Sequence, residues 1–87
     1  MAEVVGLSLR EIAREKQVIA ITHLPQIAAL GHHHLHVAKS ETGERVSTTV
    51  TALNAAGRQD EVARMLAGQR ITSRTRAHAA ELLAAHA

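Results

Sequence analysis

Histidine is the residue type in this sequence that is best suited to chemistry near neutral pH. Five of the seven histidines lie between residues 21 and 36, with four crowded into residues 32–36 and His23 standing apart in the run THLPQ. An imidazole can bind a metal ion, transfer a proton, or donate a hydrogen bond to an anion. Each role demands different neighbours, so the surroundings of the crowded histidines and of His23 decide between these roles.

The crowded histidines suit a metal ion poorly. His34 and His36, two residues apart on an expected strand, would point to the same face and could bind zinc. No acidic residue or cysteine lies close in sequence to complete a tetrahedral set of ligands, and a structural zinc site usually has two spaced ligand pairs. We therefore expect a polar edge and no metal, with a site built on His34 and His36 as the weak alternative.

Motifs for self-sufficient catalysis are missing from the 87 residues. There is no cysteine, no G-x-S-x-G serine elbow, no G-x-x-x-x-G-K-[ST] phosphate loop and no G-x-G-x-x-G turn. The carboxylates of Asp60 and Glu61 open a predicted helix, where they favour its dipole. We therefore do not expect the chain to hydrolyse a nucleotide by itself.

The composition limits the size of the core and suggests the cellular compartment. With 87 residues and no Phe, Trp or Tyr, the chain can build at most one domain with a thin aliphatic core. The net charge of +2 comes from dispersed basic residues and does not by itself indicate a nucleic-acid binder. No apolar run approaches the length of a membrane span, and the lack of cysteine fits a reducing compartment. We expect a soluble, cytoplasmic protein that does not contact membranes.

The segments before His23 predict a helix followed by a buried strand. Apolar residues with helical spacing indicate a helix over residues 3–16, with a stripe formed by Val5, Leu9, Ile12 and Ala13. The continuous apolar run QVIAIT, residues 17–22, is too short for a helix and is typical of a strand buried on both faces of a parallel sheet. Such a strand needs neighbours on both edges, so we expect the 87 residues to be incomplete as a domain.

The residues after His23 predict a turn into a short helix. Pro25 pushes Leu24 towards an extended backbone and suits the first turn of a helix over residues 25–30. Gly31 would end this helix in the left-handed conformation. His23 would then lie at the carboxyl end of a buried strand, the edge at which open α/β sheets bind ligands. From topology alone, the simpler alternative is a histidine that only hydrogen-bonds the backbone.

The rest of the chain predicts an antiparallel hairpin and two helices. Residues 33–40 and 44–53 favour strands joined at Gly43, and Val46, Val50 and Ala52 alternate with polar residues. The two helices are expected over about residues 58–67, with Gly68 beyond the end, and from Thr72 or Ser73 to about Ala85. Their predicted inward residues are Val62, Met65 and Leu66, then Ala79, Leu82 and Leu83. The expected fold class is therefore α/β.

Three runs together carry a resemblance to a known family. They are QVIAITHLPQIAALGHHHLHVAKS, DEVARMLAGQRIT and AHAAELL, at residues 17–40, 60–72 and 77–83. In this combination they resemble the C-terminal end of RecN, the SMC-like DNA repair ATPases with an ABC-type head. The similarity extends over essentially the whole chain, whereas a general ABC ATPase would share the strand and its histidine but not the later runs.

The resemblance implies a fold and a role for His23. Residues 1–87 would form the C-terminal part of an ABC-type ATPase head, without its Walker A, signature and Walker B motifs. His23 corresponds to the switch histidine, which senses the γ-phosphate of ATP and helps to orient the attacking water. ATP and magnesium serve the complete head of the family, and none is expected to bind this chain alone.

The resemblance also implies partners. The family acts in repair and recombination at DNA double-strand breaks, so the expected partners are double-stranded DNA and either the missing part of the head or a second head. A truncated gene product and a piece completed by a separate partner are both compatible with this resemblance. Two alternatives come from other classes: a small histidine-rich module for metal binding or protein interaction, and a nonfunctional remnant.

Overall fold

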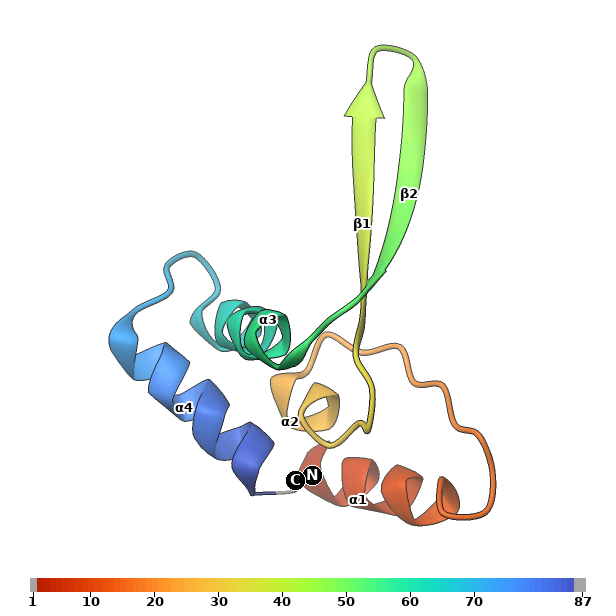
Figure 1. Cartoon of the computed structure of the whole chain (residues 1–87), viewed down its shortest axis with the longest axis vertical. Coiled ribbons are helices and arrows are strands. Elements are labelled where there is room, and N and C mark those ends of the chain that lie inside the picture. Colours follow the sequence, from red (N-terminus) through yellow and green to blue (C-terminus); the bar gives the residue numbers. More distant parts are fainter. Residues whose placement is uncertain (1, 86–87) are drawn as a thin grey trace.

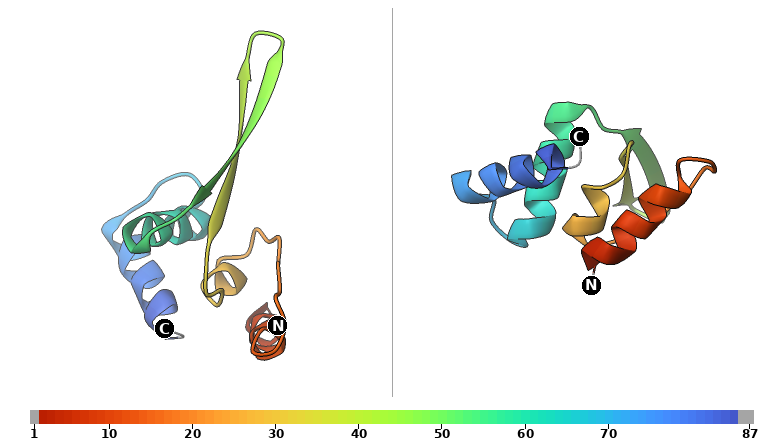
Figure 2. Two further views of the ribbon diagram at one scale, coloured as in Figure 1. Left: turned by 45° about the vertical axis from the view of Figure 1, so that its right-hand side comes forward. Right: turned by 90° about the horizontal axis from the view of Figure 1, so that it is seen from below.

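The computed structural model describes residues 2–85, which form helices and one antiparallel hairpin (Figure 1). The helices are α1 (Ala2–Ile12), α2 (Pro25–Ala28), α3 (Ala55–Ala67) and α4 (Ser73–Ala84), and the strands are β1 (Leu35–Thr42) and β2 (Arg45–Ala52). Contacts run from α1 to α2, from α2 to α3 and from α3 to α4, while the hairpin projects away from the helices (Figures 1 and 2). This mixture is consistent with the predicted α/β class.

The core lies between α3 and α4. The fully buried side chains here are Val62, Ala63 and Ala79, and the half-buried residues packed against them are Leu66, Leu82 and Leu83. The predicted inward faces of both helices are therefore confirmed, although Met65 is only half-buried. Alanines at two of the three buried positions let the helices approach but bury little apolar area, so the core is as thin as the composition predicts.

Local signals set the ends of α3 and α4. The side chain of Asn54 accepts a hydrogen bond from the backbone N–H of Gly57, and this cap starts α3 three residues before the predicted Arg58. Gly68 follows α3 with a φ of 75°, as predicted for a residue beyond a helix end. Thr72 caps α4 reciprocally with Thr75, which confirms the predicted start.

The first helix is shorter than predicted and packs through a different face. It ends at Ile12, because residues 13–15 form a turn in which Arg14 and Glu15 donate to carbonyls three residues earlier. Two residues of the predicted stripe, Val5 and Ile12, are about half exposed, at 49% and 51%. The buried residue is Gly6, where a Cβ atom would lie 2.3 Å from Cδ1 of Leu30. The contact with α2 therefore depends on a missing side chain, which an apolar stripe does not reveal.

The hairpin is confirmed with a shifted boundary. β1 begins at Leu35 and not at the predicted position 33, and its pairing with β2 runs from Leu35 opposite Ala52 to Thr42 opposite Arg45. Gly43 has a φ of 64° in the two-residue turn, which confirms the glycine requirement there. The strands are solvent-exposed except at His36, so Val46 and Val50 do not face a core as the alternation predicts.

The strand predicted over residues 17–22 is not formed. This segment has no regular structure, and Ile19 and Ile21 are 80% and 100% exposed. A strand is stabilised by hydrogen bonds to a neighbouring strand, and among residues 2–85 only β1 and β2 pair with each other. The prediction of a buried strand is therefore wrong for the described residues.

None of the helices within residues 2–85 is long and apolar enough to cross a membrane.

Candidate functional site

His23 lies in a turn that joins the extended segment to α2. The backbone N–H of Leu24 donates to Oγ1 of Thr22 across 2.9 Å, so the turn closes over His23. Leu24 is extended, with φ −96° and ψ 118°, and Pro25 occupies the first turn of α2, both as predicted. The imidazole of His23 is exposed. An exposed imidazole at the entrance to a helix is free to donate a hydrogen bond to a ligand.

The predicted setting of His23 is confirmed only in part. The helix after it is present, but the segment before it is an exposed chain and not a buried strand. Among the described residues, His23 therefore does not lie at the edge of a sheet. What remains is the turn itself, in which Thr22 and Leu24 hold His23 between them.

Arginines from two other helices hold the opposite end of α2. The Nη2 atom of Arg58 lies 3.0 Å from the carbonyl oxygen of Ala28 and 3.2 Å from that of Ala29, and it also donates to the carbonyl of Gly31. From α1, Nη1 of Arg10 donates to the carbonyl of Leu30 across 3.2 Å. These bonds satisfy carbonyls that a helix end leaves without partners.

The predicted cap at Gly31 is wrong. Among the described residues, only Gly43 and Gly68 have positive φ values. α2 ends at Ala28, with Ala29 still in the right-handed helical region, so the left-handed turn never forms. The carbonyls that such a turn would satisfy are bonded to Arg58 and Arg10, and sequence reasoning missed both residues because they lie 20 to 30 positions away.

His36 approaches a carboxylate from α3, and the charge of the same carboxylate acts on His34. Nε2 of His36 lies 3.7 Å from Oε2 of Glu61, whose side chain is 13% exposed. Nε of Arg64 donates to both carboxylate oxygens of Glu61 at 3.0 Å, and this hydrogen bond holds the pKa of Glu61 below its usual value. Glu61 is the acidic neighbour that the local sequence around the histidines did not offer.

The imidazole of His34 is disfavoured in its charged form. Burial, followed by the positive charge of Arg58, lowers the pKa of His34 below its usual value of 6.5, although Glu61 opposes this effect. Its Nδ1 atom is buried and has no hydrogen-bond partner among the residues that the structure describes. Burial and the positive charge of Arg58 therefore both oppose protonation of His34.

A metal ion finds no ready site in the described part of the chain. No group of three or more His, Asp or Glu side chains within residues 2–85 is arranged to hold one. His36 does approach Glu61, but Arg64 occupies both oxygens of that carboxylate. The weak alternative of a metal at His34 and His36 gains no support from this arrangement.

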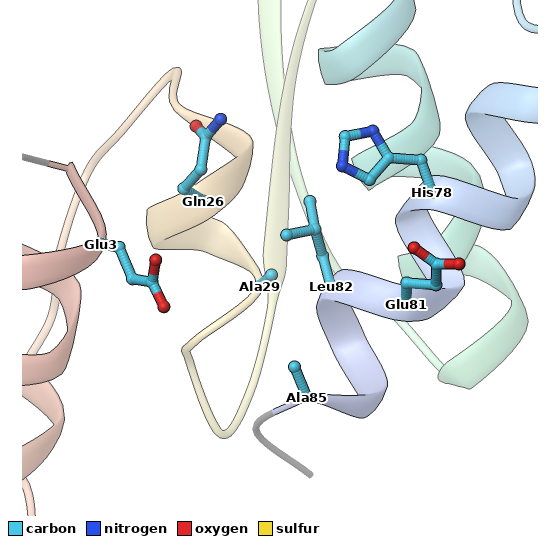
Figure 3. A pocket seen from close by; sticks show the side chains of 7 residues that line it. All are labelled: Glu3, Gln26, Ala29, His78, Glu81, Leu82 and Ala85. Atoms are coloured by element: carbon cyan, nitrogen blue, oxygen red, sulfur yellow. The ribbon is translucent and has the colours of Figure 1, made fainter.

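A shallow cavity of about 180 Å³ lies between α4 and the pair α1 and α2 (Figure 3). Its apolar lining residues are Ala29, Leu82 and Ala85, and its polar ones are Glu3, Gln26, His78 and Glu81. Gln26 belongs to the THLPQ run, so this end of α2 faces the cavity. His23 is not among the lining residues, so the cavity and the histidine are separate features.

Several known proteins similar to this chain carry the same name. A protein named DNA repair protein RecN from Vibrio cholerae is 45% identical over 84 residues, which is 97% of this chain. Proteins of the same name from Halalkalibacterium halodurans and Haemophilus influenzae are each 43% identical, over 95% and 94% of the chain. In each case the chain spans only 15% of the length of the relative. No family model matches the chain.

Proposed function

We propose that this chain functions as the C-terminal part of a RecN-type ATPase head, because it is similar to a segment of RecN over nearly its whole length. Such a head would act in the repair and recombination of DNA double-strand breaks. His23 is the residue through which the segment takes part in ATP hydrolysis. The observation that carries this proposal is the 40–45% identity over nearly all of the chain.

The chemistry assigned to His23 suits its geometry. Phosphoryl transfer is catalysed chiefly by positioning and by stabilising charge on the transferred group, and an imidazole N–H can do both. His23 is exposed and lies in a turn held by Thr22 and Leu24, so its donor can reach a phosphate brought by another part of the head. Pro25 and Gln26 shape this turn and α2 and take no part in the chemistry.

The remaining parts of the site come from elsewhere in the proposed head. The 87 residues contain no phosphate loop, so the groups that cradle ATP and magnesium belong to the rest of the head or to a second head. The exposed apolar segment at residues 17–22 is the surface that a neighbouring strand of that head would cover. The chain alone is therefore expected to hydrolyse ATP no faster than buffer does.

A chimera tests the proposal. The matching segment of RecN from Haemophilus influenzae is replaced by this chain, and ATP hydrolysis and magnesium-dependent ATP binding are measured separately. We expect the chimera to hydrolyse ATP and His23→Ala to slow hydrolysis by about 10²–10³-fold, as for loss of one donor to the transition state, with ATP binding retained.

His33→Ala is the matched control, because His33 is also exposed but lies outside the turn. The rate of ATP hydrolysis by this variant should stay within about twofold of that of the parent chimera, as expected of a side chain that does not touch the reacting atoms. A chimera in which His23→Ala hydrolyses ATP as fast as the parent would disprove the assigned role.

A further inference from the structure

The α2 helix is too short to be stable by itself. It has four residues, a single turn, and an isolated helix of this length does not persist in water because nucleation costs more than one turn returns. It also lacks the glycine cap that ends many helices, since Gly31 has no positive φ. Its persistence therefore depends on contacts made by other elements.

Two guanidinium groups make those contacts at the carbonyl end. Arg58 on α3 shares its Nη2 hydrogens among the carbonyls of Ala28, Ala29 and Gly31, and Arg10 on α1 donates to the carbonyl of Leu30. Ala29 and Leu30 are 4% and 3% exposed, so these bonds are shielded from water on one side. Positive charge at the carbonyl end of a helix is also favourable for its dipole.

The other end of α2 is continuous with the turn at His23. The backbone N–H groups of Ile27 and Ala28 both donate to the carbonyl of Leu24 at 3.1 Å. The N–H of Leu24 in turn donates to Oγ1 of Thr22. His23 thus lies inside an unbroken series of hydrogen bonds that begins at Thr22 and ends at the two arginines.

We infer that Arg58 is a positioning residue for His23, acting with Arg10 by holding the carbonyl end of α2 so that the turn before it keeps one conformation. This inference rests on the proposed function for the role of His23, but the anchoring of α2 is a property of the chain alone. Arg58 donates hydrogen bonds to the main-chain carbonyls of Ala28, Ala29 and Gly31. It acts only through the main chain of α2.

The test measures the 87-residue chain by NMR. Hydrogen exchange of the Ala28 and Ala29 amides reports α2, backbone ¹⁵N relaxation of His23 reports the turn, and exchange of the Val62 amide reports the core. We expect Arg58→Ala to speed exchange in α2 by about tenfold or more, as for loss of hydrogen bonds from a charged donor, and to increase motion at His23. Exchange at Val62 should stay within about threefold, because the core cluster around Val62 is formed by residues of α3 and α4.

Two further variants help to interpret the exchange rates of Arg58→Ala. Arg58→Lys keeps the charge but loses the planar fork, so it should give α2 exchange rates between those of the wild type and Arg58→Ala. Arg64→Ala is the matched control: it removes an arginine from the same helix that bonds Glu61 and not α2, and it should leave α2 and His23 unchanged.

The outcomes are decisive. Wild-type exchange in α2 of Arg58→Ala would overturn the inference. If Arg58→Ala unfolds the whole chain, Arg58→Lys decides: a loss confined to α2 and His23 supports the inference, while wild-type behaviour or complete unfolding contradicts it. A chimeric head in which His23→Ala keeps full ATP hydrolysis would refute the proposed function but leave the anchoring of α2 to be judged on these exchange rates.

Discussion

At the scale of single residues, the electrostatic environment of the chain centres on the base of the hairpin. His34 is held near its neutral form by burial and by Arg58, while Glu61 is held ionised by Arg64. Both effects favour the folded state at neutral pH, because the unfolded chain would bind more protons than the folded one as the pH falls. The two groups act in different ranges, His34 below about pH 6.5 and Glu61 below about pH 4.5.

The folded chain should lose stability on mild acidification through His34. Because the pKa of His34 is lowered in the folded state, stability is complete above the unfolded value of 6.5 and falls as the pH drops towards the folded value. We expect the urea midpoint to fall between about pH 7.5 and about pH 5.5, and His34→Gln to fall less over that interval. His33→Gln, at an exposed neighbour, is the control and should fall as the wild type does. Equal pH dependence in His34→Gln and the wild type would contradict the prediction.

At the scale of elements, sequence patterns predicted what depends on nearby residues. The sequence predicts the hairpin turn at Gly43, the cap at the start of α4 and the glycine beyond the end of α3. It does so because turn and cap residues act on atoms three or four positions away. The strand predicted over residues 17–22 does not form, and the anchor at Arg58 is not predicted, because each depends on partners that a local sequence pattern does not show. Every residue type has a backbone carbonyl, so the sequence does not show which carbonyls accept a hydrogen bond from a distant arginine.

Gly6 should be the most sensitive position of α1. A Cβ atom there would lie 2.3 Å from Cδ1 of Leu30, so Gly6→Val must displace a buried side chain. We expect a loss of about 1–2 kcal/mol in the free energy of unfolding, in which overpacking outweighs the modest gain in helix propensity. Ser8→Val, on an exposed position of the same helix, should change it by less than about 0.5 kcal/mol. Urea titrations of both variants check this, and equal effects would argue against close packing at Gly6.

Gly43→Ala should weaken the hairpin and nothing else. Its φ of 64° costs an alanine about 1 kcal/mol, which corresponds to a roughly fivefold rise in opening of the hairpin. Amide exchange at Ala38 and Thr49, an opposed pair in the register whose N–H groups lie between the strands, measures this opening. Glu44→Ala, beside Gly43 but without a positive φ, should leave the exchange rates near those of the wild type. Faster exchange at Val62 as well would mean that the hairpin and the helices open together.

At the scale of the whole molecule, the chain buries little and exposes much apolar surface. Within residues 2–85, the buried apolar side chains are Ala29, Leu30, Val62, Ala63 and Ala79, whereas Ile19, Ile21 and one face of the hairpin are open to solvent. That face carries Leu35 and Ala52, then Val37 and Val50, as opposed pairs. Such surface supports the proposal that a larger head covers it, and it leaves the chain alone with a small margin of stability.

Val62→Ala should consume much of that margin. Val62 is fully buried between α3 and α4, and removing its two methyl groups is expected to cost about 2 kcal/mol from lost burial and the remaining void. For a chain of this size the melting temperature should fall by roughly 8–16 °C. Val46→Ala, whose parent side chain is 64% exposed on the hairpin, should shift it by less than about 3 °C. Thermal melts followed by circular dichroism compare the two, and similar shifts would place the core elsewhere.

The anchor of α2 has a consequence for how this segment can be varied. Arg58 and Arg10 grip only peptide oxygens, and every amino acid supplies the same oxygen at the same place. These hydrogen bonds therefore do not depend on which side chains α2 carries. The exposed Gln26, which faces the cavity, can be exchanged for a residue of another chemistry while the helix stays where it is. α2 can thus keep its position while the side chains on the surface beside His23 are substituted one at a time.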